Sequence, residues 1–306
     1  MPAIELAAVT KRYGDLTALH SLDLTVDDGE VFGFLGPNGA GKSTTINILL
    51  DFVRPSAGTA RVLGLDAQRD TSAVHERVGV LPEGFELYER LTAKEHLRFA
   101  MRTKGVREDP AVLLERVGLD PDESRAVGGF SKGMRQRLAL AIALVGEPDL
   151  LILDEPSSGL DPNGAREMRR IVTEENERGA TVFFSSHILE QVEAVCDRVG
   201  IMHHGELISL GTVDELRKRL GSSATMTVLL GGMVDGVPHT IEQVAGVNAV
   251  DDIEGGLRIE CQSTEAKAAA IREIHDAGIS IHDIQIEERS LEDLFAELTT
   301  EEALPA

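Results

Sequence analysis

The chain has 306 residues, of which 42% are hydrophobic and 27% charged, an ordinary composition for a globular protein with a sizeable core. Its 52 acidic and 30 basic residues give a formal net charge of −22, which disfavours binding through attraction to a nucleic-acid backbone. No apolar run approaches the roughly 20 residues that cross a bilayer, and no secretion signal is visible. The two widely separated cysteines, Cys196 and Cys261, exclude a disulfide framework and fit a reducing cytoplasm.

Apolar segments and helical periodicity alternate along the first two thirds of the chain. The predicted strands are 4–9, 22–26, 31–35, 150–153 and 181–184. The predicted helices are 93–103 and 109–117, and 201–202 with 206–210 predict a hairpin. Because strands interleave with helices, and 31–35 is apolar throughout as in a strand buried on both faces, we expect an α/β fold with a mainly parallel sheet.

The chain changes character near Gly221, where the sequence GSSAT is typical of a flexible linker. We therefore predict one domain over 1–220 and a second over 221–306. The second carries 17 acidic and 4 basic residues, a net charge of −13. Its predicted strands are 225–230, 257–261 and 281–287, and its predicted helices are 264–277 and 290–298, the latter capped by Ser290 with Asp293. This pattern predicts a small α+β module.

The strongest motif is GPNGAGKST, which fits G-x-x-x-x-G-K-[ST] between a predicted strand and a predicted helix. It comprises Gly36, Pro37, Asn38, Gly39, Ala40, Gly41, Lys42, Ser43 and Thr44. Glycines let backbone N–H groups converge on phosphate oxygens, and the helix beginning near Gly41 directs its positive end at the same anion. We expect Lys42 to reach the β- and γ-phosphates of a nucleotide and the Ser43 hydroxyl to bind Mg²⁺.

The apolar run 150–153 ends in Asp154 and Glu155. Alone, the pair could be a strand end at the surface, but beside a P-loop we expect Asp154 to hold Mg²⁺ and Glu155 to polarise an attacking water. The long separation from Lys42 predicts a helical insert over about 85–145. Within it, Ser131 is a candidate N-cap for a helix, so either an ordinary capped helix or a second anion-binding helix end is possible there.

Further segments carry a family resemblance. Segment 130–137 resembles the ABC signature, and segment 157–161 resembles the D-loop. His187 resembles the switch histidine, and Tyr13 resembles the aromatic residue that stacks on adenine. Residues 1–220 thus resemble the ATP-binding subunit of ABC transporters. The resemblance implies a P-loop NTPase cassette, with a RecA-like core sheet and a helical insert, that hydrolyses ATP.

The sequence departs from the family pattern at two motifs. Glu83 stands where the Q-loop has Gln, while Lys132 and Met134 replace a Gly and the Gln of the signature. A carboxylate at position 83 can still bind Mg²⁺ through oxygen, although it cannot donate as an amide does. Both variants, and the tail segment 290–299, resemble the exporter branch that includes daunorubicin-resistance-type subunits.

The resemblance also implies partners and roles. Two copies, or a pair of cassettes, form a head-to-tail dimer in which Ser131, Lys132, Gly133 and Asp161 of one subunit approach the ATP held by the other. Glu155 activates water with help from His187. A separate membrane permease holds the pair at the inner face of the cell membrane, with 83–91 as the coupling surface. The alternative is an ABC ATPase without a permease that acts on DNA or ribosomes.

Several features leave two interpretations open. The tail either stabilises the dimer or senses a ligand. His203 and His204 are expected in a solvated turn rather than in a metal site, and both cysteines are expected to pack as small side chains. The acidic surplus, with 23 of the 30 basic residues being Arg, fits either a salt-rich cytoplasm or an ordinary acidic protein. Export rather than import rests on the branch resemblance alone.

Overall fold

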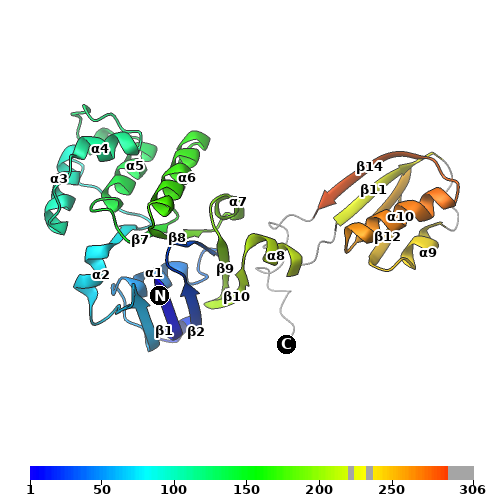
Figure 1. The fold of residues 1–306 in the computed structure, drawn as a ribbon, viewed down its shortest axis with the longest axis horizontal. Coiled ribbons are helices and arrows are strands. Elements are labelled where there is room, and N and C mark those ends of the chain that lie inside the picture. The colour runs from blue at the N-terminus through cyan, green and yellow to red at the C-terminus, as the bar shows by residue number, and fades with distance from the viewer. Residues whose placement is uncertain (220–223, 232–236, 289–306) are drawn as a thin grey trace. The chain divides into compact units, whose positions relative to one another are not determined.

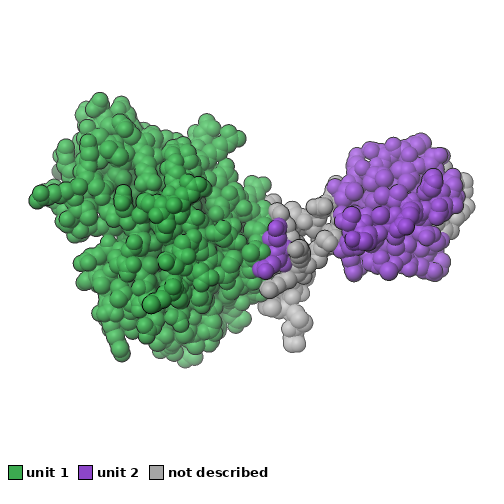
Figure 2. Space-filling model, viewed as in Figure 1, with its two compact units in different colours: residues 1–213 green, residues 214–306 purple. Residues whose placement is uncertain are grey.

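The computed structural model describes residues 1–219, 224–231 and 237–288, and its contacts divide the chain into two compact units, 1–213 and 214–306 (Figures 1 and 2). The division falls a few residues before the predicted domain boundary at 220. No helix within these described ranges is both long and apolar enough to cross a membrane.

A six-stranded sheet forms the centre of the first unit. Its order is β10 (Glu206–Gly211), β9 (Arg198–His203), β3 (Val31–Leu35), β8 (Thr181–Ser186), β7 (Leu150–Asp154) and β6 (Val78–Leu81). All neighbours are parallel except the β9–β10 hairpin, which confirms the predicted mainly parallel sheet. Strand β6 was not predicted because it is short and contains Gly79. That glycine is required, since a Cβ there would lie 2.1 Å from the carbonyl oxygen of Ala143.

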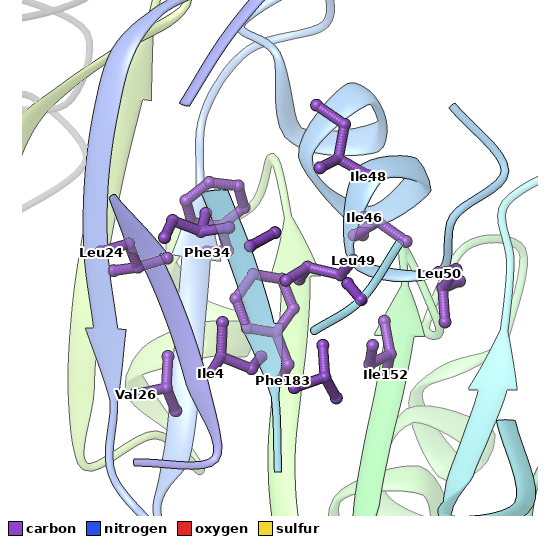
Figure 3. Packing of buried hydrophobic residues seen from close by; sticks show 14 of the residues in the cluster. Ile4, Leu24, Val26, Phe34, Ile46, Ile48, Leu49, Leu50, Ile152 and Phe183 are labelled. Atoms are coloured by element: carbon purple, nitrogen blue, oxygen red, sulfur yellow. The ribbon is translucent and has the colours of Figure 1, made fainter. Parts of the chain in front are cut away.

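An antiparallel sheet packs beside the parallel one. It has the order β2 (Leu16–Val26), β1 (Ile4–Tyr13), β4 (Ala57–Val62) and β5 (Leu65–Asp66). Both β1 and β2 extend beyond their predicted apolar segments, because backbone pairing continues through irregularities of the register into polar residues. Side chains of both sheets and of helix α1 (Lys42–Leu49) meet in one core (Figure 3), which includes Ile4, Leu24, Phe34, Leu49, Ile152 and Phe183. This core supports the segment that follows β3.

Helices α3 (Ala93–Lys104), α4 (Pro110–Arg116) and α5 (Lys132–Ala143) contact one another and form the predicted helical insert (Figure 1). Each begins at a side-chain cap. Thr92 and Glu95 form a capping box, Asp109 caps α4 before Pro110, and Ser131 caps α5 as predicted. Helices α2 (Thr71–Arg77), α6 (Pro162–Glu177) and α7 (Leu189–Glu193) of this unit were not predicted, nor was α8 (Val213–Arg219), which begins at the last residue of the unit.

The second unit has the element order βαββαβ, the ferredoxin-like arrangement. Its elements are β11 (Ala224–Leu230), α9 (Val237–Glu242), β12 (Val247–Ile253), β13 (Gly256–Cys261), α10 (Thr264–Asp276) and β14 (Ile281–Glu288), with sheet order β12-β13-β11-β14. The predicted α+β module is confirmed. Strand β12 was not predicted because its residues are half-buried or exposed, and the predicted helix 290–298 lies outside the described residues.

Candidate nucleotide site

The candidate site residues come together because four parallel strands end at one edge of the sheet. Leu35 pairs with Ser186, Asp154 with Ser185, and Leu81 with Leu153. The segments that follow β3, β8, β7 and β6 therefore all leave the sheet at this edge. These segments contain the P-loop, His187, Glu155 and Glu83. In open α/β sheets, ligands bind at this carboxyl edge.

The P-loop residues form a tight turn that leads into α1. Gly39 and Gly41 have φ values of 84° and 107°, a range that favours glycine. Helix α1 begins at Lys42, as predicted, with Ser43 and Thr44 in its first turn. The Lys42 amine is buried and donates to the carbonyl oxygens of Gly36 at 2.6 Å and Pro37 at 3.3 Å. The positively charged amine of Lys42 is thus held at the inner side of the loop.

Glu155 lies between the P-loop lysine and the predicted switch histidine. Its Oε1 is 3.6 Å from Lys42 Nζ, and its Oε2 is 2.9 Å from Nδ1 of His187. Glu155 is 7% exposed, so it is not a surface strand end, and within the described part of the chain its Oε1 has no hydrogen-bond donor. Its φ of 49° is uncommon for a non-glycine residue and is typical of functional sites. A buried carboxylate is therefore held between two basic groups.

Ser185 hydrogen-bonds to the carboxylate of Asp154 and to the backbone of Glu155, and the sequence did not predict it as a site residue. Its hydroxyl donates to Asp154 Oδ1 and accepts from the backbone N–H of Glu155 at 3.1 Å. The one signal in the sequence that could have indicated Ser185 is its position as a hydroxyl residue at the end of a predicted strand. Its role depends on the pairing of β7 with β8, which the local sequence does not reveal.

Two of the residues that depart from the family pattern, Glu83 and Lys132, line one cavity. This cavity has a volume of about 370 Å³, and its lining includes Glu83, Lys132, Arg135, Asp154 and Glu155. Glu83 is exposed, and the stem of Lys132 lies over Gly159, where an added Cβ would be 2.3 Å from Lys132 Cε. A carboxylate at position 83 and an ammonium at position 132 thus bring opposite charges to one space.

Comparison with known proteins agrees with this geometry. Residues 19–158 match the model of the ABC transporter family, and residues 211–299 match the model described as "ATP-binding protein DrrA1-3-like, C-terminal domain". The linearmycin resistance ATP-binding protein LnrL of Bacillus subtilis is 34% identical over 299 residues, covering 95% of this chain and 96% of that protein. The daunorubicin resistance ATP-binding protein DrrA3 of Streptomyces coeruleorubidus is 35% identical over 302 residues, covering 97% and 96%.

This chain belongs to the ATP-binding proteins of ABC transporters. A solved structure of an "ATP binding subunit of ABC transporter" has a TM-score of 0.66 and 33% identity, and covers 71% of this chain and 92% of that one. The predicted fold class and the predicted ATPase family are confirmed, and ATP is the ligand that the P-loop of such a cassette binds.

The predicted signature segment and the predicted D-loop line one cavity at two capped helix ends. Ser131 accepts from the N–H of Met134 at 3.2 Å, and Asp161 caps α6 by accepting from the N–H of Gly164 at 2.7 Å. A second cavity, of about 320 Å³, is lined by Ser131, Gly133 and Asp161 among others. Gln136, a residue not predicted for the site, donates from Nε2 to the carbonyl of Pro156 at 2.8 Å and ties the signature helix to the segment after Glu155.

Tyr13 lies away from the shared sheet edge, and His203 differs from the sequence-based expectation. Tyr13 ends strand β1 of the antiparallel sheet, is 46% exposed, and has Lys11 Nζ 4.7 Å from its ring centroid. The predicted solvated turn at His203 and His204 is wrong for His203, which ends strand β9 and is 5% exposed, with its ring centroid 4.1 Å from that of His204. Cys196 packs against Gly33, and burial raises the pKa of its thiol.

Proposed function

We propose that this chain hydrolyses ATP to power a separate membrane permease that exports an antibiotic-like compound. The observation that carries the proposal is the buried Glu155, held between Lys42 and His187 at the carboxyl edge of the parallel sheet. Export and the class of cargo rest on the relatives, whose names refer to resistance to linearmycin and daunorubicin. The alternative of a permease-free ATPase acting on DNA or ribosomes is disfavoured by these relatives and by the net charge of −22.

The side chains divide the chemistry among them. Glu155 accepts a proton from the attacking water, and the hydrogen bond with His187 orients this carboxylate. Lys42 supplies positive charge to the β- and γ-phosphates, where negative charge is redistributed during transfer. The N–H groups of Gly39, Gly41 and the first turn of α1 bind phosphate oxygens in the same loop.

A magnesium ion fits the oxygen donors of this site. Asp154 is a buried carboxylate at the end of β7, and the Ser43 hydroxyl stands in the first turn of α1. Hydroxyl and carboxylate oxygens are the ligands that Mg²⁺ takes beside nucleotide phosphates, and Glu83 adds an exposed carboxylate on the side of β6. When bound, the ion neutralises phosphate charge.

We further propose a homodimer in which the signature segment of one copy covers the P-loop of the other. Ser131, Gly133 and Asp161 line a polar cavity that is separate from the cavity beside Glu155. At this cavity, the N-terminal end of α5 offers backbone N–H groups to a phosphate, while α6 begins with Pro162 and is capped by the Asp161 carboxylate. We propose that the second unit stabilises this dimer, which truncation after Leu220 tests through loss of ATP-dependent dimerisation.

An apolar groove supports a permease partner at the inner face of the membrane. It has a volume of about 410 Å³ and lies between the core sheet and the helical insert, with Phe52, Tyr88, His96, Phe99 and Lys104 among its lining residues. Phe52, Tyr88 and Phe99 are 62%, 66% and 55% exposed, an unusual exposure for large apolar side chains. Tyr88 belongs to the predicted coupling surface 83–91. The groove suits the apolar face of a short helix from the permease.

The test of the ATPase assignment is the Glu155→Gln variant, which keeps the shape of the side chain and removes the base. We expect ATP binding to persist and turnover to fall about 10² to 10⁴-fold. Glu147→Gln is the matched control, because Glu147 also has a positive φ, 46°, but is exposed. Phosphate release measured on purified chain reports turnover. A Glu155→Gln variant that hydrolyses ATP at the parent rate would overturn the proposal.

A further inference from the structure

The turn between β9 and β10 is joined to the P-loop. Gly205 donates from its N–H to the carbonyl oxygen of Ala40 at 2.9 Å, and its own carbonyl accepts from the N–H of His20 at 2.9 Å. The turn thus bridges the phosphate-binding loop and strand β2 of the antiparallel sheet. None of the family motifs described above includes this turn.

The three backbones approach so closely that side chains are excluded between them. A Cβ on Gly205 would lie 2.6 Å from the carbonyl oxygen of Ala18, and a Cβ on Gly41 would lie 3.0 Å from the same oxygen. The added Cβ on Gly41 would also lie 3.5 Å from the Cα of Gly205. Because real Cβ atoms do not approach oxygens at 2.6 Å, glycine at position 205 is needed for this packing as well as for its φ of +81°.

Both ends of the P-loop rest on the same hairpin. At the start of the loop, a Cβ on Gly36 would lie 2.6 Å from the carbonyl oxygen of Met202 in β9. At the end, Ala40 receives the hydrogen bond from Gly205. In the turn, His204 has a φ of 46°, and its ring centroid lies 4.1 Å from that of the buried His203. The hairpin therefore forms a support beneath the loop.

The hydrogen bond to Ala40 has a directional consequence. The Ala40 carbonyl and the Gly41 N–H belong to one planar trans peptide, in which C=O and N–H point in opposite directions. By holding the carbonyl, Gly205 directs the Gly41 N–H to the opposite side of that peptide. An N–H that is aimed before the anion arrives binds it without the cost of ordering the peptide first.

We infer that the turn His204–Gly205 is a positioning element for phosphate binding, acting through the Ala40–Gly41 peptide. The inference rests on the proposed nucleotide-binding role of the P-loop. The turn does not touch the reacting atoms, and its effect is on nucleotide affinity. Loosening the turn should therefore weaken nucleotide binding. The loss of affinity should be larger than that of a variant elsewhere in the unit that loses the same amount of fold stability.

The test compares Gly205→Ala with Gly29→Ala in the full chain. Gly29 has a similar φ of +74° and lies in the same unit, but a Cβ there would meet nothing within 4 Å. Both variants carry the backbone strain of alanine at positive φ, and Gly205→Ala alone disturbs the contact with Ala18. Binding of MgADP is measured by titration calorimetry, and unfolding by thermal denaturation. We expect the dissociation constant to rise at least tenfold for Gly205→Ala and less than twofold for Gly29→Ala.

Parent-like affinity in Gly205→Ala, or equal weakening in both variants, would overturn the inference. A parent chain that binds no MgADP would instead refute the proposed function. Because Gly205→Ala can fail to fold, residue-resolved amide hydrogen exchange on the parent chain provides a second measurement. We expect the Gly205 amide to be protected with and without MgADP. Free exchange of this amide in the MgADP-bound chain would also overturn the inference.

Discussion

Glu175 offers a test of how the helical insert is fastened to the core. It lies on α6 and is 1% exposed, with Oε1 2.6 Å from Arg116 Nη2 on α4 and Oε2 2.8 Å from Arg178 Nη2. One buried carboxylate therefore neutralises two guanidinium groups that are 27% and 29% exposed. Glu175→Gln keeps the shape of the side chain and leaves both arginines without their counter-charge.

Removing one partner of a buried ion pair costs about 3 to 5 kcal/mol. Because both arginines retain some contact with water, we expect the lower end, a loss of about 3 kcal/mol in the free energy of unfolding. For a unit of this size, that corresponds to a fall in Tm of about 6 to 12 °C. The neighbouring Glu174 is 38% exposed and pairs with Arg170, so Glu174→Gln is the matched control, with an expected loss of about 0.5 kcal/mol.

Urea unfolding followed by tyrosine fluorescence measures both variants. The chain has no Trp, and its two tyrosines, Tyr13 and Tyr88, lie in the first unit, so the signal reports the cassette alone. At 1 M KCl the small effect of Glu174→Gln should shrink, while that of Glu175→Gln should persist, because salt screens exposed charges more than buried ones. Equal losses in the two variants would refute the reasoning.

Two further predictions concern buried polar groups. Burial raises the pKa of Glu30 above its ordinary 4.5 despite the nearby Arg198, so its contribution to stability is greatest below pH 4.5 and is lost as pH rises through the higher folded value. Glu30→Gln should therefore gain stability relative to the parent between pH 4.5 and pH 7, and a constant difference in urea unfolding would contradict this. Gln136→Leu leaves the buried carbonyl of Pro156 without its donor, which costs about 1 to 3 kcal/mol. We expect its turnover of ATP to fall more than its affinity for ATP, and a parent-like turnover would show that the tie to the segment after Glu155 is not needed.

Local patterns predicted well the strands whose burial is complete and a helix that begins at a side-chain cap. Strands 31–35 and 150–153 are apolar throughout and recur as β3 and β7, and the capped helix at Ser131 recurs as α5. Elements with mixed or interrupted patterns were missed. Strand β6 contains a glycine that the packing of α5 requires, and β12 is half-buried, so neither carries the apolar periodicity on which prediction depends.

The residues of the site likewise fall into those that the sequence predicts and those that it does not. The P-loop and the pair Asp154-Glu155 are recognisable in sequence because phosphate binding constrains the local backbone and its residue types. The buried hydroxyl of Ser185 and the amide of Gln136 are ordinary residues in ordinary segments. Their roles arise only where one strand pairs with another or a helix end meets a loop.

By itself, the sequence determined the family and the acidic balance, and it predicted the nucleotide-binding loop and the division of the chain into two domains. Only the tertiary structure decided that Glu83 and Lys132 share a cavity with Glu155, that His203 is buried, and that Gly205 holds the peptide before Gly41. The physical reason is that a motif specifies a local conformation. Contacts between distant segments depend instead on sheet order and register, which arise from packing of the whole unit.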